Sequence, residues 1–257
     1  KVAGIVLNIT NEKQMEADVW ANELIKEKLT SMDIVGQYAS EEEATITNCG
    51  EGVSVTVDPL DGSSNIPTNN LVGTIVGVYD KELPAGSDSL IGSFYLVYGP
   101  LTSAIVAENG QVDEYVIENI PDDTVKAVKV GEDLKLDEPK IYGFGGNKGW
   151  YEDFRKFENE LSRELKLRYG GSFVDDVNQL IHYGGVFGYP AKESAPDGKY
   201  RLQFEAIPVA NIFDSMDNAC SSDGEKNIQD VEITELHQRT PLFVGNKELI
   251  EEIENIR

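Results

Sequence analysis

The sequence predicts an α/β protein whose strands are concentrated in the first half of the chain. The chain has 257 residues, of which 40% are hydrophobic and 9% aromatic, enough to form a sizeable core in one large domain or two small ones. Apolar residues recur at helical spacing in some segments and alternate with polar residues in others. No internal repeat or low-complexity run is present, so the chain has the pattern of a globular protein.

The first half begins with a helical pattern and continues with strands. Helical spacing predicts an amphipathic helix over residues 13–30, carried by Met15, Val19, Leu24, Ile25 and Leu29. Alternation of valine with Ser54 and Thr56 predicts a strand over 53–57 that stops at Asp58. Further strand-like runs cover 71–79, 91–98, 102–107 and 113–118. The stretch 90–107 approaches the length of a membrane span, but Gly99 and Pro100 divide it, which favours two buried strands around a turn.

A change of composition separates the two halves. Residues 119–140 are rich in Asp, Glu and Lys and contain two prolines, as is typical of a domain boundary. We therefore expect two units, residues 1–136 and 137–257. In the second unit, apolar spacing predicts helices around 150–165 and 174–181. Alternating residues predict a strand over 200–204 that ends at Glu205, a short strand follows at 242–244, and Asn246 is expected to cap a last helix.

Composition excludes several classes of function. With 46 acidic and 22 basic residues the formal net charge is −24, which disfavours nucleic acids and anionic membrane surfaces as partners. Two cysteines, Cys49 and Cys220, form no metal-binding motif and are expected to be buried, reduced thiols. Only His182 and His237 are available as histidine bases, which disfavours serine or cysteine nucleophile mechanisms. No signal peptide is visible, so we expect a cytoplasmic protein.

The segment 58–65 is the strongest candidate for chemistry. Two carboxylates, Asp58 and Asp61, follow a β-branched strand, and Gly62 lets the backbone come close to a ligand. The backbone N–H groups after Gly62 are suited to an anion, so one loop offers cation ligands beside a phosphate cradle. A turn that merely ends a strand remains the simpler alternative.

Two further acidic positions could join this loop. Glu41, Glu42 and Glu43 form a run that a solvated surface would also explain. Glu205 ends the predicted strand over 200–204, and a structural ion pair with Arg201 or Lys199 is equally consistent with its position. Oxygen ligands without histidine or cysteine favour Mg²⁺ or Mn²⁺ over Zn²⁺.

These residues resemble the class I fructose-1,6-bisphosphatases, including archaeal members, within the sugar-phosphatase and inositol monophosphatase superfamily. The resemblance covers nearly the whole chain. Its superfamily-level motif is 58–65, and motifs more specific to the bisphosphatases lie at 167–172, 183–190, 198–202 and 236–241. The resemblance implies a layered α-β-α-β-α sandwich with metal ions in the first half and the sugar in the second.

The resemblance also implies a role for each acid. Two or three Mg²⁺ ions, or Mn²⁺, would be held by Glu41, Glu42, Asp58, Asp61, Glu205 and the carbonyl oxygen of Leu60. Asp18 and Glu42 would position and deprotonate the attacking water, next to Glu41. Glu12 occupies the position of a loop aspartate that completes the family's metal set.

The substrate residues are implied in the same way. Gly62 and Ser63 would hold the 1-phosphate, and Ser172 and Phe173 would line the sugar through backbone groups. The 6-phosphate would be bound by Asn147, Tyr169, Tyr189 and Lys199. Arg168 would reach the same phosphate across a subunit interface, which implies a homodimer or homotetramer.

The sequence departs from the family pattern at several places. Trp150 replaces a tyrosine at the 6-phosphate and could still donate one N–H, while Asp217-Asn218 replaces a Gly-Gly pair. The family's N-terminal helices, which often carry an AMP site, have no counterpart in this sequence, so AMP control is not expected.

The implied activity is metal-dependent hydrolysis of the 1-phosphate of fructose 1,6-bisphosphate in gluconeogenesis, yielding fructose 6-phosphate and phosphate. Sedoheptulose-1,7-bisphosphatase and inositol monophosphatase activities remain alternatives within the superfamily. A non-catalytic protein that binds cations or sugar phosphates is an alternative of a different class.

Overall fold

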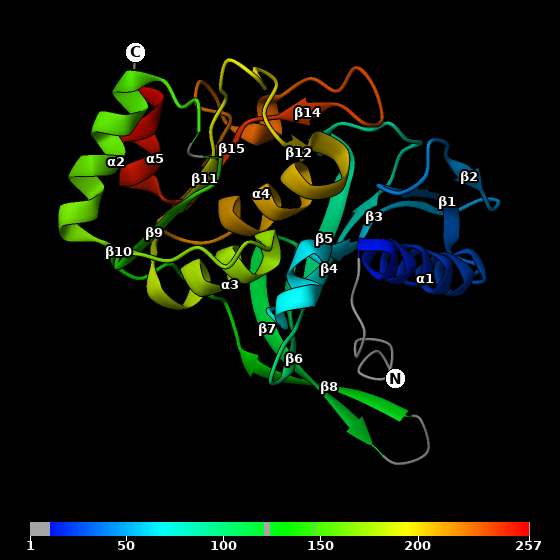
Figure 1. The fold of residues 1–257 in the computed structure, drawn as a ribbon. Helices are drawn as coiled ribbons and strands as arrows, with labels where there is room; N and C mark the ends of the chain where they lie inside the picture. The colour runs from blue at the N-terminus through cyan, green and yellow to red at the C-terminus, as the bar shows by residue number, and fades with distance from the viewer. Residues whose placement is uncertain (1–10, 121–123, 147, 257) are drawn as a thin grey trace.

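Two β-sheets alternate with helices to form five layers, α-β-α-β-α (Figure 1). The computed structural model describes residues 11–120, 124–146 and 148–256. Helices α3 and α4 lie between the two sheets, α1 covers the outer face of the larger sheet, and α2 and α5 cover the outer face of the smaller one. The predicted layered α/β sandwich is therefore confirmed.

The larger sheet has eight strands in the order β2-β1-β3-β4-β5-β6-β7-β8. From β3 to β8 each strand pairs antiparallel with the next, whereas β1 pairs parallel with β3. The strands are β1 (Val35–Ser40), β2 (Thr47–Asn48), β3 (Val53–Asp61), β4 (Val72–Tyr79), β5 (Leu90–Tyr98), β6 (Thr102–Glu108), β7 (Gln111–Ile120) and β8 (Thr124–Gly131).

The smaller sheet has five strands in the order β10-β9-β11-β15-β13. They are β9 (Ile141–Phe144), β10 (Lys166–Leu167), β11 (Gly185–Tyr189), β13 (Ala219–Ser222) and β15 (Leu242–Asn246). A separate two-stranded ribbon joins β12 (Tyr200–Arg201) to β14 (Arg239–Thr240). This ribbon brings the segments before Glu205 and after His237 together.

The helices are α1 (Asn11–Thr30), α2 (Glu152–Glu164), α3 (Phe173–Tyr183), α4 (Ile207–Asp214) and α5 (Lys247–Glu254). The largest hydrophobic cluster lies where α3 and α4 pack between the sheets, and it includes the fully buried Tyr79, Tyr95 and Phe213. A second cluster joins α2 and α5 to the smaller sheet through Phe144 and Phe154, whose ring centroids are 5.0 Å apart. None of the helices in the described ranges is long and apolar enough to cross a membrane.

Most predicted elements are confirmed, and the exceptions have physical causes. The strand predicted over 200–204 is wrong beyond Arg201, because 202–206 form a turn of π-helix that leads into α4. The alternation is misleading because the whole turn is buried: Gln203 points inward and bonds both the N–H and the carbonyl of Ala85, at 2.9 and 3.1 Å.

The stretch 119–140 contains strand β8, which the sequence analysis did not predict. The two lysines of this edge strand, Lys126 and Lys129, suggest a solvated linker in the sequence, although charged side chains are a common feature of exposed sheet edges. The larger sheet ends at Gly131 and the smaller one begins at Ile141, so the expected boundary at residues 136/137 falls between them.

Two smaller expectations also need correction. Asn246 is the residue before α5, but its side chain does not cap that helix. Its Oδ1 accepts a hydrogen bond from Gly185 N at 2.6 Å, and its Nδ2 donates to Asp137 O at 2.9 Å. Both cysteines are free as expected, but Cys49 is exposed and Cys220 is only partly buried.

Candidate active site

A bulge in strand β3 brings Asp58 and Asp61 to the same region of the protein. The strand does not stop at Asp58 as expected but continues to Asp61. Asp58 pairs with Ile75 and Asp61 pairs with Gly73, so three steps along β3 match two steps along β4. In a regular strand, residues three apart point to opposite faces, and one extra residue reverses this. The bulge therefore lets both carboxylates face the same site.

Three carboxylates from three separate segments converge beside this bulge. Oxygen atoms of Glu41, Asp58 and Glu205 all lie within 4.8 Å of one another. Glu41 follows β1, Asp58 lies in β3, and Glu205 lies in the π-helical turn before α4. Asp58 and Glu205 are buried, with 5% and 7% of their surface exposed. We call these three residues the acidic cluster.

The environment of the cluster disfavours its ionised form. Burial, followed by the charges of Glu41, Asp61 and Glu205, raises the pKa of Asp58 well above its usual range. Burial and the charge of Glu41 likewise raise the pKa of Glu205. Buried carboxylates this close together call for a compensating cation.

One arginine supplies part of that compensation. Arg201 Nε donates to Glu41 Oε1 at 2.7 Å, and the backbone N–H of Arg201 donates to Glu205 Oε2 at 2.6 Å. The alternative ion pair between Glu205 and the Arg201 side chain is therefore wrong, because the guanidinium pairs with Glu41 instead.

Asp61 connects the bulge to the second half of the chain. Its Oδ2 accepts hydrogen bonds from Ser172 Oγ at 2.9 Å and from Val174 N at 2.8 Å, at the start of α3. Burial raises the pKa of Asp61 to about 6, although these two hydrogen bonds oppose the rise. Gly62 has a φ of 77°, and a Cβ there would lie 2.3 Å from Ser172 Cβ, so only glycine allows this close approach.

Asp18 faces the same site from helix α1. Burial raises its pKa to about 6, a hydrogen bond with Ser63 opposes the rise, and the charges of Glu42 and Glu41 add to it. Glu42 is exposed and does not belong to the acidic cluster, and burial and the charge of Glu41 raise its pKa. The side chain of Glu12 lies outside the described residues. Leu60 N donates to Asp58 Oδ1 at 3.1 Å, which shapes the bulge.

A pocket of about 400 Å³ lies on the second half of the chain and contains two of the predicted phosphate residues, Tyr189 and Lys199. Lys199 Nζ is 5.1 Å from the Tyr189 ring centroid and 5.2 Å from that of Tyr200. The charge of Lys199 also lowers the pKa of Asp61 and Glu205, although burial raises both pKa values by more. The pocket is therefore close enough to the acidic site for their charges to interact. Lys192 and Arg239 line the same pocket.

The other predicted substrate residues lie around this region in different states. Tyr169 is 48% exposed, and its ring stacks 6.3 Å from that of Phe187. Arg168 Nη1 donates to Gln179 Oε1 at 3.0 Å, and its guanidinium lies over the Tyr183 ring. Phe173 is buried and stacks on Tyr200 at 4.3 Å, whereas Asn147 lies outside the described residues.

Two of the departures from the family pattern are resolved by the structure. Trp150 Nε1 donates to Gly145 O at 3.1 Å, so the N–H that the sequence analysis left available for the 6-phosphate is already used within the protein. Asn218 adopts a φ of 63°, the left-handed conformation that Asn tolerates better than most other non-glycine residues.

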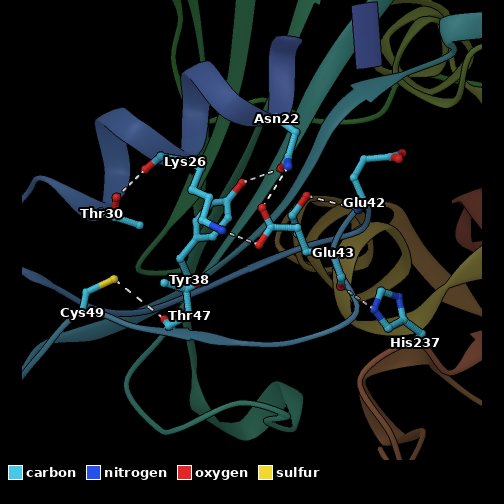
Figure 2. A network of polar contacts seen from close by, with 10 residues as sticks. Asn22, Lys26, Thr30, Tyr38, Glu42, Glu43, Thr47, Cys49 and His237 are labelled. Atoms are coloured by element: carbon cyan, nitrogen blue, oxygen red, sulfur yellow. Dashed lines mark hydrogen bonds and ion pairs between the residues drawn. The ribbon is translucent and has the colours of Figure 1, made fainter. Parts of the chain in front are cut away.

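The sequence analysis did not identify the residues that hold the loop containing Glu41, Glu42 and Glu43 in place. Figure 2 shows Glu43 contacting Asn22 and Lys26 of α1 through its side chain and His237 through its backbone carbonyl. The run Glu41-Glu42-Glu43 therefore contains one member that is tied to a helix rather than solvated. No local pattern indicates this, since His237 is 194 residues away from Glu43 in the sequence.

The donor atoms fit a hard divalent cation. Carboxylate oxygens from Glu41, Asp58 and Glu205 are the ligand type that Mg²⁺ and Mn²⁺ prefer, and no histidine or cysteine belongs to the group. Two of the three are buried with raised pKa values, so a bound cation would relieve their mutual repulsion.

Comparison with known proteins agrees with this geometry. Residues 2–122 match the family model for the fructose-1-6-bisphosphatase N-terminal domain, and residues 136–257 match that for the C-terminal domain. The chain is 47% identical over 251 residues to a class 1 fructose-1,6-bisphosphatase of Natronomonas pharaonis, covering 96% of this chain and 87% of the relative. For a class 1 enzyme of Haloarcula marismortui the values are 43% over 250 residues, 96% and 84%.

Solved structures give the same result. The fructose-1,6-bisphosphatase of Leishmania major in its T-state superposes with a TM-score of 0.86 at 27% identity, covering 93% of this chain and 82% of that one. Its holo form gives a TM-score of 0.84 at 28% identity, covering 93% and 80%. The chain therefore belongs to the fructose-1,6-bisphosphatase family.

Proposed function

We propose that this protein hydrolyses the 1-phosphate of fructose 1,6-bisphosphate, giving fructose 6-phosphate and phosphate, in a reaction that depends on Mg²⁺ or Mn²⁺. The observation that carries the proposal is the convergence of Glu41, Asp58 and Glu205 beside a pocket that contains Lys199. A bisphosphate needs these two features together, a cation site for the reacting phosphate and a cationic pocket for the inert one.

The acids divide into two roles in this proposal. Glu41, Asp58, Asp61 and Glu205, with Glu42 and the carbonyl oxygen of Leu60 alongside, would hold two or three cations. Bound cations supply charge neutralisation of the phosphate and activation of water. Phosphate monoesters hydrolyse extremely slowly without such help, because the dianion repels an incoming nucleophile.

Asp18 is the proton acceptor in this proposal, with Glu42 beside it. A general base works best when its pKa lies near the working pH, and the pKa of Asp18 is raised to about 6. The water proton passes to the Asp18 carboxylate as the new oxygen–phosphorus bond forms. The bond between phosphorus and the sugar O1 breaks, O1 keeps the electron pair, and it takes up a proton from solvent water to become the hydroxyl of fructose 6-phosphate. Gly62 and Ser63 would orient the phosphate through the backbone after the bulge.

The distal phosphate is assigned to the pocket. Lys199 provides charge, Tyr189 and Tyr169 provide hydroxyl donors, and Asn147 would add an amide. Ser172 and Phe173 would line the sugar between the two ends. In this monomer Arg168 binds Gln179, and we propose that in a homodimer or homotetramer it serves the neighbouring subunit.

The two proposed roles, metal binding and sugar-phosphate binding, correspond to the two halves of the chain. We propose that residues 1–136 form the metal-binding and catalytic half and residues 137–257 the sugar-phosphate half, with Glu205 contributed across the boundary. The two free cysteines suit a reducing compartment, which supports a cytoplasmic location.

Phosphate release from fructose 1,6-bisphosphate with Mg²⁺ and with EDTA tests the function. Activity that persists in EDTA, or is absent with Mg²⁺, contradicts it. The variant Asp58→Asn should lower kcat by about 100-fold or more, because a direct ligand matters at least as much as its supporting residues. Its melting temperature in EDTA should stay close to that of the wild type, since the variant removes a buried charge. Near-normal turnover would remove Asp58 from the site.

The alternatives are separated by substrate. Comparing kcat/KM for fructose 1,6-bisphosphate and sedoheptulose 1,7-bisphosphate distinguishes the two bisphosphatases, and inositol 1-phosphate tests the third activity. Calorimetric binding of a bisphosphate without turnover would favour a non-catalytic protein.

A further inference from the structure

A continuous chain of polar contacts links helix α1 to the acidic cluster through Glu43, His237 and Arg201. Figure 2 shows its first part, from α1 through Glu43 to His237. At the helix end, Asn22 Nδ2 donates to Glu43 Oε1 at 3.0 Å and Lys26 Nζ donates to Glu43 Oε2 at 2.7 Å. Tyr38 donates to Asn22 Oδ1 at 3.0 Å, which fixes the orientation of that amide. Both carboxylate oxygens of Glu43 are therefore engaged with α1.

At the other end, the hydrogen bonds define the tautomer of His237. Its Nε2 lies 2.9 Å from the backbone carbonyl oxygen of Glu43, and a carbonyl only accepts, so Nε2 carries the hydrogen. Its Nδ1 lies 2.6 Å from Arg201 Nη1, which only donates, so Nδ1 is the acceptor. The ring also packs against Phe204, with centroids 5.1 Å apart. His237 thus connects the acidic loop to one specific guanidinium nitrogen.

Arg201 in turn donates hydrogen bonds to two members of the acidic cluster. Its Nε donates to Glu41 Oε1 at 2.7 Å, and its backbone N–H donates to Glu205 Oε2 at 2.6 Å. The loop at 40–43 is therefore held on both sides, by α1 through the Glu43 side chain and by the second half of the chain through His237 and Arg201. We call Asn22, Lys26, Glu43, His237 and Arg201 the loop clamp.

We propose that Glu43 and His237 are positioning residues that hold Glu41 in the geometry a divalent cation requires, without binding the cation or the substrate themselves. This inference rests on the proposed metal-dependent function. Glu41 is only partly buried and is repelled by Asp58 and Glu205, so without the clamp its side chain would be free to turn toward solvent. Loss of the clamp should therefore weaken cation binding before it affects the fold.

The test measures cation binding directly, without turnover. The full chain is freed of metal and titrated with Mn²⁺, and free Mn²⁺ is followed by electron paramagnetic resonance. Supporting residues around metal ligands commonly change affinity by 10- to 100-fold, so His237→Ala should raise the Kd for Mn²⁺ by about tenfold. Glu43→Gln keeps the shape of the side chain but loses the charge facing Lys26. It should also raise the Kd for Mn²⁺, but by less than His237→Ala does.

Conservative variants separate positioning from a general structural effect. In His237→Asn the side-chain oxygen replaces the Nδ1 acceptor for Arg201, whereas in His237→Gln the amide reaches the Glu43 carbonyl but offers no acceptor at the Nδ1 position. Affinity should recover more in the Asn variant, because the Arg201 contact is the one that leads to Glu41. His182→Ala is the matched control, since the other histidine contacts Glu114 at 3.3 Å and is outside the clamp. It should bind Mn²⁺ as the wild type does.

The possible outcomes are distinct. Wild-type Mn²⁺ affinity in His237→Ala overturns the inference. The inference is also overturned if all His237 variants lose Mn²⁺ affinity in proportion to a fall in their melting temperature in EDTA. That result would indicate a general structural role for His237. If the wild type itself binds no Mn²⁺, the proposed function fails and the inference fails with it. A raised Kd, a wild-type kcat at saturating Mn²⁺ and partial rescue by His237→Asn together support the clamp.

Discussion

Asp176 offers a quantitative test of the electrostatics at the start of helix α3. It lies in the first turn of α3 with 4% of its surface exposed, and its carboxylate accepts hydrogen bonds from Gly170 N at 2.6 Å and Gly171 N at 3.3 Å. These glycines follow Arg168 and Tyr169, so Asp176 shapes the loop that carries two predicted substrate residues. Burial raises its pKa from 3.8 to about 7, and the two hydrogen bonds only partly oppose the rise.

The sign and size of the effect follow from linkage. Because the folded pKa is higher than the unfolded one, the folded state binds more protons between pH 3.8 and about 7, and stability is lost as pH rises through that window. With 1.36 kcal/mol for each pKa unit, the raised pKa of Asp176 lowers the free energy of unfolding by about 2 kcal/mol at pH 5, where only the unfolded chain ionises, and by about 4 kcal/mol at pH 8. Asp176→Asn removes this dependence.

The variant also loses one acceptor for a backbone N–H, which costs about 1–3 kcal/mol at every pH. Only the pH-dependent part is therefore diagnostic. Relative to the wild type, Asp176→Asn should gain about 2–3 kcal/mol in free energy of unfolding between pH 5 and pH 8. Urea unfolding at both pH values in EDTA measures this, with the exposed Asp80→Asn as a control. A stability difference between variant and wild type that is the same at both pH values refutes the reasoning.

Three further predictions concern the loop after β3, cation binding and the distal pocket. Gly62→Ala should lower the free energy of unfolding in urea by at least about 1 kcal/mol more than Gly110→Ala does. Gly110 is the control because it has a similar φ of 75° but open space where its Cβ would lie. Equal losses would mean that the approach to Ser172 does not matter. Mg²⁺ should raise the melting temperature of the wild type at pH 8 but not that of Asp58→Asn, as measured by thermal unfolding. An equal rise in both would place the ion elsewhere. Lys199→Met should raise KM for fructose 1,6-bisphosphate about tenfold or more relative to the control variant Lys226→Met. The KM for fructose 1-phosphate, which lacks the distal phosphate, should rise less. Equal effects on both substrates would contradict a distal-phosphate role for Lys199.

The sequence predicts the parts of this fold whose signals are local. Helix α2 presents Phe154, Phe157 and Leu161 at spacings of three and four, and α3 repeats the pattern, so both helices lie where expected. The candidate ligands Asp58 and Asp61 could be found because both belong to one short motif. In each case the information lies within a few residues of the position concerned.

The remaining parts depend on contacts that a local pattern does not contain. The bulge in β3 is visible only in its register with β4, and the π-helical turn at 202–206 mimics a strand because Gln203 is buried against Ala85. Arg201 and Glu41 meet across 160 residues of sequence, so their pairing could not be chosen in advance over a pairing with Glu205. Side chains that position other side chains carry no periodic signal of their own.

The distribution of charge accounts for an acidic chain that serves an anionic substrate. The net charge of −24 includes a cluster whose buried carboxylates repel one another and a phosphate alike. The pocket behaves in the opposite way: among the described residues, Lys192, Lys199 and Arg239 form no ion pair with a carboxylate. In the proposed site, one end would therefore attract phosphate by itself, whereas the other would attract it only after cations are bound. Under the proposed assignment of the two phosphates, this difference would orient a bisphosphate, because the phosphate at the cation-dependent end would be the one that reacts.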